Sequence, residues 1–248
     1  MTRVLSAFRS STRAWRGKDR RADRGFTLAE VTISIVVLGV VLAAVQTTLI
    51  MTQRTLSDQS IRVDQTQQGK VAIESVSKVL RTAVLPSQLS ASCSGCADLA
   101  AFIKGTPTQV QFYANINNDR NIIGPSRVSY TVNASNQLIE TMQAPNAHAA
   151  DDYNYQYCSP GPGCQITTRV LANYMVPGQA VFTYYDKNGA SLGTDPLDAN
   201  ELKMVDSVDI VISTKRTAAS RVPATTFTSR VSLPNADSIA QPTASATP

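Results

Sequence analysis

The sequence predicts an α+β fold in which one long N-terminal helix packs on an antiparallel β-sheet head. Residues 26–85 contain no proline, and their first half is apolar while their second half is amphipathic. From Pro86 onward, short alternating runs of apolar residues are separated by turn residues, as in antiparallel strands. The chain has 248 residues, which is enough for one sizeable domain and an anchor.

The positive charge of the chain is concentrated in residues 1–25. This leader carries eight basic and two acidic side chains, whereas the whole chain has a net charge of only +5. Positive charge beside an apolar segment keeps the leader on the cytoplasmic side of a membrane. The remainder is nearly neutral, so no general nucleic-acid binding is expected.

Residues 26–53 are predicted to be a transmembrane or filament-core helix. No charged side chain occurs from residue 31 to residue 53, and the apolar part is long enough to span a membrane. One carboxylate, that of Glu30, stands at the start of this run. A charge at membrane depth costs about 2.5 to 3.5 kcal/mol on insertion scales, so Glu30 is expected to have a function.

The basic leader followed by GFTLAE at residues 25–30 resembles the class III signal of type IV pilins and type II secretion pseudopilins. The resemblance implies that a prepilin peptidase cleaves after Gly25 and methylates the new amino terminus of Phe26. It also implies that Glu30 guides the subunit into a helical filament. The implied partners are this peptidase, other pilins or pseudopilins and an inner-membrane assembly platform. The implied location is the cytoplasmic membrane, crossed once with the head outside, and then a pilus or pseudopilus at the cell surface or in the periplasm.

Other targeting signals fit the sequence less well. A conventional signal peptide with its apolar core at residues 31–42 leaves Glu30 without a purpose, and the apolar run continues to Met51. A twin-arginine signal at Arg20 and Arg21 is weaker still, because Asp23 and Arg24 follow before any hydrophobic run. An uncleaved signal anchor that displays a surface binding protein or adhesin head remains the alternative function.

Residues 54–85 are predicted to be an amphipathic helix that docks on the sheet. An apolar stripe at helical spacing consists of Val71, Ala72, Val76, Val79, Leu80 and Val84. The opposite face carries Glu74, Ser75, Lys78 and Arg81. Gly39 and Gly69 are the weak points of the helix, each costing about 1 kcal/mol relative to alanine.

Residues 86–234 are predicted to be a β-rich head with disulfides, and residues 235–248 a disordered tail of small polar residues. Strands are expected at residues 109–114, 128–132, 138–142, 166–171, 181–185, 207–214 and 227–233, with a hairpin turn at residues 133–136. The last two strands are similar to the closing strands of PilW-type minor pilins and J-type minor pseudopilins.

Four cysteines follow the apolar segment, as Cys93 and Cys96 and then Cys158 and Cys164. In an oxidising compartment two disulfides are expected, most simply within each local pair, with cross-pairing between the pairs as the alternative. A zinc site of four thiolates is the competing interpretation, but five residues separate the second pair, which is too many for a zinc knuckle.

The sequence contains no catalytic motif, so no enzyme activity and no cofactor are expected. The single histidine, His148, lies in a loop-like stretch before Asp151 and Asp152. The candidates for a calcium loop are Asn115, Asn117 and Asp119, but only Asp119 is charged, and a polar turn is expected instead. A second acidic loop contains Asp195, Asp198, Asn200 and Glu201, and Tyr153, Tyr155 and Tyr157 alternate before Cys158 as packing or binding residues.

Overall fold

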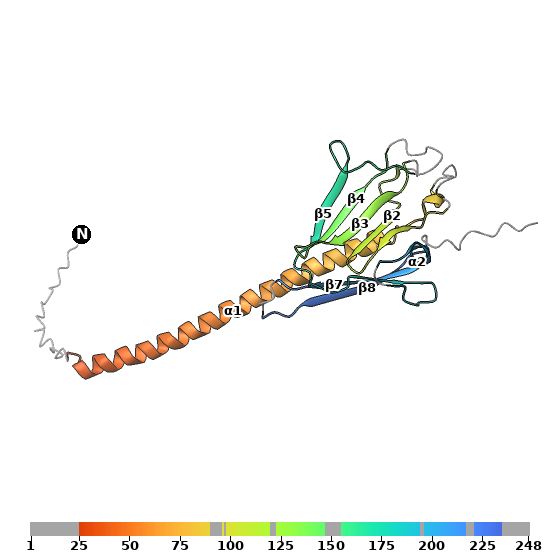
Figure 1. Cartoon of the computed structure of the whole chain (residues 1–248). Coiled ribbons are helices and arrows are strands. Elements are labelled where there is room, and N and C mark those ends of the chain that lie inside the picture. Colours follow the sequence, from red (N-terminus) through yellow and green to blue (C-terminus); the bar gives the residue numbers. More distant parts are fainter. Residues whose placement is uncertain are drawn as a thin grey trace, which may run out of the picture. The chain divides into compact units, whose positions relative to one another are not determined.

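The computed structural model describes residues 25–89, 96, 98–119, 123–146, 155–193, 196–216 and 221–234 (Figure 1). One long helix is followed by antiparallel strands, which confirms the predicted α+β class. The chain divides into two compact units, Met1–Gln53 and Arg54–Pro248. The leader before Gly25 and the segment 235–248 lie outside the described residues.

In the first unit, the helix α1 (Leu28–Leu80) begins directly after Thr27. The carbonyl of Thr27 accepts backbone hydrogen bonds from Glu30 and Val31, and its hydroxyl accepts one from the amide of Glu30 at 3.3 Å. Thr27 therefore acts as the N-cap, and Glu30 is the third residue of the first turn. Every residue from Gly25 to Gln53 is exposed.

In the second unit, α1 buries one stripe of side chains against the head. Its members are Gln65, Gly69, Ala72, Ile73, Val76, Ser77 and Leu80. The expected stripe is therefore right at Ala72, Val76 and Leu80 but wrong at Val71, whose side chain is 60% exposed. The buried face is displaced because strands contact the helix from two sides, and one of these sides meets Gly69, Ile73 and Ser77.

The helix ends at Leu80, five residues before the predicted end at residue 85. The reason is that the next residues pair with a strand instead of continuing the helix. Ala83 forms a β-bridge with Ala114, the amide of Val84 donates to the carbonyl of Tyr113, and the amide of Asn115 donates to the carbonyl of Thr82. A short 3₁₀ helix, η1 (Pro86–Gln88), follows.

The first sheet has five antiparallel strands in sequence order. They are β1 (Phe102–Gly105), β2 (Gln109–Ala114), β3 (Ser126–Val132), β4 (Leu138–Gln143) and β5 (Ile166–Ala172). The predicted turn between β3 and β4 is confirmed, and Asn136 takes a positive φ of 56° there, which asparagine tolerates better than most residues. The strand β1 was not predicted, because only two of its four residues, Phe102 and Ile103, have large apolar side chains.

The remaining strands form a second sheet, whereas the sequence led us to expect one. Its order is β6 (Phe182–Tyr185), β7 (Ser207–Thr214) and β8 (Thr225–Ser232), with the short helix α2 (Ala199–Met204) before β7. The second half of α1 touches both sheets (Figure 1), because Ser75 accepts a hydrogen bond from Arg169 of β5 and Ser77 contacts Ser229 of β8. Each sheet therefore has its own contact with α1.

Both sheets share one hydrophobic core. The rings of Phe102 and Tyr184 meet edge to face at 6.5 Å between centroids, and Phe112 stacks on Tyr130 at 6.2 Å. The hydroxyl of the buried Tyr184 donates toward the carbonyls of Thr106 and Gln109, each at 3.1 Å. This tyrosine of β6 therefore ties the second sheet to the turn before β2.

Candidate functional site

The cleavage site predicted from the sequence lies on accessible backbone. Gly25 and Phe26 precede the helix, and the ring-bearing side chain of Phe26 is 78% exposed. No described atom lies within 4 Å of the position that a Cβ on Gly25 would occupy. The described surroundings thus leave the peptide bond between these two residues open to a processing enzyme.

Glu30 carries the one charge of this unit's described residues from Gly25 to Gln53. Its carboxylate has no ion-pair or hydrogen-bond partner among the described residues, although its backbone amide is capped by Thr27. A carboxylate in the first turn is favoured by the positive end of the helix dipole. That interaction does not replace a counter-charge in an apolar environment, so the carboxylate is available to a cation from another molecule.

The helix after Glu30 presents apolar side chains on all sides. The large ones that are exposed are Val31, Ile33, Ile35, Val36, Val37, Leu38, Val40, Val41, Leu42, Val45, Leu49, Ile50 and Met51. By length and composition this part of α1 can cross a membrane, and none of its apolar window is buried within the chain. A continuous exposed apolar surface of this extent requires lipid or other apolar helices around it.

The hydroxyl groups on the same stretch are satisfied within the helix. Each donates to a backbone carbonyl three or four residues earlier, at 2.8 to 3.0 Å, and the donors are Thr32, Ser34, Thr47, Thr48 and Thr52. Internal satisfaction of polar groups is the condition for a helix to enter hydrocarbon. The threonine and serine residues therefore do not oppose burial of the helix.

The disulfide Cys158–Cys164 is present, and it closes one of the two local loops that the sequence predicts. The side-chain Nε2 of Gln143, at the end of β4, donates to the backbone carbonyl of Cys158 at 2.6 Å and attaches this loop to the first sheet. Cys96 is also disulfide-bonded, but Cys93 lies outside the described residues. The pairing of Cys93 with Cys96 therefore stays a prediction.

The tyrosines before Cys158 contact the first sheet where the structure describes them. The hydroxyl of Tyr157 donates to the carbonyl of Pro125 at 2.7 Å, and the guanidinium of Arg127 lies over the Tyr157 ring at 4.1 Å. Burial raises the pKa of the Tyr157 phenol. Tyr155 lies against Gly124, and Tyr153 is outside the described residues. These contacts account for Tyr155 and Tyr157 as packing residues.

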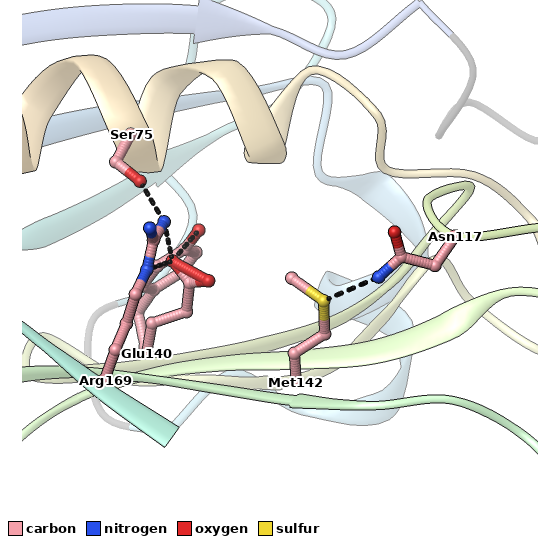
Figure 2. Close-up of polar contacts among 6 residues, drawn as sticks. Ser75, Asn117, Glu140, Met142 and Arg169 are labelled. Atoms are coloured by element: carbon pink, nitrogen blue, oxygen red, sulfur yellow. Dashed lines mark hydrogen bonds and ion pairs between the residues drawn. The ribbon is translucent and has the colours of Figure 1, made fainter. Parts of the chain in front are cut away.

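The asparagine-rich loop between β2 and β3 is organised by its own hydrogen bonds. Asn118 donates to the side-chain oxygen of Asn115 at 2.9 Å and accepts from the amides of Ile123 and Gly124 at 3.0 Å. Asn117 has a positive φ of 54° and donates to the sulfur of Met142 (Figure 2). Asp119 is the last described residue before the gap at residues 120–122. Within the described parts of the chain, no three histidine, cysteine, aspartate or glutamate side chains gather as metal ligands.

The second acidic loop is corrected by the structure, because its described residues begin α2. Asp198 accepts from the amides of Asn200 and Glu201, and the Glu201 side chain accepts from the amide of Asp198, which forms a capping box. The signal for this helix was present as D-x-x-E in the sequence. Asp195, His148, Asp151 and Asp152 lie outside the described residues.

A buried ion pair that sequence reasoning missed joins the helix to the first sheet (Figure 2). The carboxylate of Glu140 is almost fully buried, and Arg169 donates to it through Nη2 at 2.8 Å and Nε at 3.1 Å. The same guanidinium donates to the hydroxyl of Ser75 on α1 at 2.7 Å. The hydrogen bond to Glu140 raises the pKa of Arg169, and burial followed by the charge of Glu140 raises that of Tyr130. The cluster positions the helix and has no exposed reactive group.

Comparison with protein families matches residues 20–45 to the prokaryotic N-terminal methylation motif. The matched segment contains Gly25, Phe26 and Glu30 together with the start of the exposed apolar helix. No curated protein matches the chain. The motif and the apolar helix support membrane anchoring of a head domain, and the α+β architecture is consistent with the pilin fold. The chain therefore carries a class III methylation signal, and this signal supports a type IV pilin-like or pseudopilin-like protein.

Proposed function

We propose that this protein is a minor pilin or pseudopilin, a structural subunit that initiates or joins a type IV pilus or a type II secretion-like filament. The observation that supports it is the position of the methylation motif, which includes the start of α1 and leads into an apolar stretch of the helix that is not buried within the chain. Such a helix is buried in lipid before assembly and among neighbouring helices afterwards. The motif makes the chain a substrate of a processing enzyme, and no catalytic role is proposed for its own residues.

Processing would remove residues 1–25 and leave Phe26 at the amino terminus. The new α-amine would carry a positive charge close to the start of α1, one turn before Glu30. In an apolar filament core the carboxylate of Glu30 needs a cation, because an unpaired buried charge is costly. The Phe26 amine of a neighbouring subunit supplies it, so that this pair sets the axial position of each new subunit.

The proposal assigns a separate role to each segment of the chain. Residues 26–53 anchor the protein in the cytoplasmic membrane and later pack in the filament, and residues 54–234 form the amphipathic half of α1 and the disulfide-containing head outside. The partners are a prepilin peptidase, other pilins or pseudopilins and an inner-membrane assembly platform. Two closing strands, β7 and β8, support the closer likeness to PilW-type minor pilins and J-type minor pseudopilins.

Mass spectrometry of the mature amino terminus tests the proposal. We expect N-methylated Phe26 as the first residue in cells that contain the peptidase, and the full leader in cells that lack it. Gly25→Leu should accumulate as full-length precursor in the membrane, since the peptidase must approach backbone beside a residue without a side chain. Retention of residues 1–25 in the wild type would instead favour an uncleaved anchor that displays a surface binding protein or adhesin.

A further inference from the structure

The strand β8 is an open edge of the second sheet. Its eight residues pair with β7 without a shift in register, from Ser207 opposite Ser232 to Thr214 opposite Thr225. The other edge strands are protected, because β1 and β6 have only four residues and the pairing of β5 with β4 is shifted at Leu138. The sequence of β8 contains neither lysine nor proline, the residues that commonly protect an edge.

The backbone of β8 has groups available for another strand. In an antiparallel pair, successive residues direct their N–H and C=O groups alternately toward the partner strand and away from it. Among the described residues, the backbone of β8 hydrogen bonds only to β7. Half of its residues therefore present unpaired donors and acceptors at the outer side of the sheet, which is the arrangement that binds an added strand.

A shallow groove of about 420 Å³ runs between this edge and the second half of α1. Its walls are Ile73, Glu74, Ser77, Lys78 and Arg81 on the helix and Thr228 and Ser229 on the strand. A second hollow of about 300 Å³ is lined by Thr228, Ser229 and Arg230 of β8 together with Asp209, Ile210 and Val211 of β7. The middle of β8 thus borders both hollows, and Figure 1 shows the strand at the margin of the sheet near α1.

The charges beside the groove select an acidic occupant. Lys78 and Arg81 form no ion pair with any described residue, whereas Glu74 lies 3.9 Å from Lys70 and Arg230 is paired with Asp209. The uncompensated charge at the groove is therefore positive. A second copy of the chain, joined edge to edge through β8, would bring two positive walls together, and such like-charge contact is unfavourable.

We propose that β8 receives an extended, acidic segment of another protein as a fourth strand of the second sheet, with its carboxylates directed at Lys78 and Arg81. Main-chain hydrogen bonds to the open edge supply affinity, and the two cations select the partner's charge. The inference concerns the head alone and does not depend on cleavage after Gly25.

The probe for the test is a fluorescein-labelled peptide of eight residues in which glutamate and valine alternate, and its comparison peptide has lysine in place of glutamate. Binding to the full chain in detergent micelles is followed by fluorescence anisotropy. We expect the acidic peptide to bind and to slow hydrogen exchange at alternate amides of β8, and the lysine peptide not to bind. Binding of both peptides with equal affinity, or an absence of protection in β8, would overturn the proposal.

Two pairs of variants separate charge from strand pairing. Lys78→Glu combined with Arg81→Glu should weaken binding of the acidic peptide roughly tenfold or more, because two attractive contacts become repulsive. The matched control is Lys104→Glu with Lys187→Glu, which changes the net charge equally at exposed sites outside the groove and should leave the affinity within about twofold. Equal losses in both double variants would contradict a role for the groove.

Thr228→Pro and Ser229→Pro test the edge itself. Adjacent amides point to opposite sides of the strand, so one of these variants removes a bond to β7 and the other removes only an outward donor. The variant that retains the wild-type unfolding temperature should lose peptide binding. If both variants unfold, the test rests on whether the acidic peptide slows hydrogen exchange at the β8 amides of the wild-type protein. The proposal would be refuted if the peptide bound only after residues 235–248 had been deleted, because the edge would then belong to the chain's own end. It would also be refuted if the full chain self-associated and the same proline variant abolished that self-association, because the edge would then bind a second copy.

Discussion

Glu140 and Arg169 lie directly opposite each other on β4 and β5, and their side chains form an ion pair with a 2.8 Å contact that faces α1. The glutamate is almost completely buried, while about half of the arginine side chain is exposed. Because Arg169 also donates to Ser75, one guanidinium connects two strands to the amphipathic half of the helix. The strength of this connection can be measured.

Arg169→Met should lower the free energy of unfolding by about 2 to 3 kcal/mol, because it leaves the carboxylate of Glu140 buried without its cation. This expected loss of unfolding free energy is smaller than for a fully buried ion pair, since solvent reaches the arginine side chain. Urea unfolding of the full chain in detergent measures it. Arg230→Met is the control, because its pair with Asp209 is more exposed and should contribute less than about 1 kcal/mol. Equal losses in the two variants would remove the distinction.

Gly69→Ala should destabilise the protein even though alanine is the better helix former by about 1 kcal/mol. A Cβ at this position would lie 2.5 Å from Cδ2 of Phe227 on β8, so the helix and the strand would have to move apart. Overpacking of this kind costs about 1 to 3 kcal/mol, which exceeds the gain in propensity. Thermal unfolding shows whether Gly69→Ala lowers or raises the stability. Adding Phe227→Leu to the alanine variant should recover part of the lost stability. If the alanine variant were more stable than the wild type, the Phe227 ring would have to make room for the new Cβ at little cost.

The phenols of Tyr130, Tyr157 and Tyr184 should stay protonated well above the ordinary pKa of tyrosine. Burial raises the pKa of all three, with the charge of Glu140 as a further cause at Tyr130. A pKa that is higher in the folded state means that the stability these groups contribute is present below about pH 10 and declines above it, because the unfolded chain then releases their protons.

Absorbance at 295 nm during alkaline titration measures this delay. The wild type is compared with a variant that lacks one of the three buried phenols, and the early part of the titration is the range near the ordinary pKa of tyrosine. Tyr157→Phe should leave the early part unchanged. A reduction of the early absorbance by Tyr157→Phe would contradict the buried state of its hydroxyl.

Glu30→Ala should be cleaved after Gly25 and inserted into the membrane, yet be absent from sheared filaments. If Glu30 pairs with the Phe26 amine of a neighbour, the variant leaves that amine unpaired, which typically costs about 3 to 5 kcal/mol. That is sufficient to reduce incorporation more than a hundredfold. Asp58→Ala is the matched control, an exposed carboxylate on the same helix outside the apolar run. Incorporation of Glu30→Ala at the wild-type level would leave the pairing mechanism without support.

The sequence by itself determined the features that depend on local chemistry. The apolar run after Glu30, the absence of proline before Pro86 and the turn at residues 133–136 each act through neighbouring residues, so the α+β class, the long helix and the β3–β4 hairpin could be predicted. The motif around Gly25 is also local, because a processing enzyme reads a short stretch of chain. The capping box of α2 was equally readable from Asp198 and Glu201, and was overlooked.

Only the tertiary structure decided which parts of the head meet. The division into two sheets, the burial of Ile73 and Ser77 in place of Val71, and the exact end of α1 depend on contacts between residues far apart in the sequence. Strand alternation places Glu140 on the same face as Leu138 and Met142, but its pairing with Arg169 follows only from the register of β4 and β5. The open edge of β8 likewise exists because no other strand of the described residues lies beside it, and local sequence does not encode the absence of a neighbour.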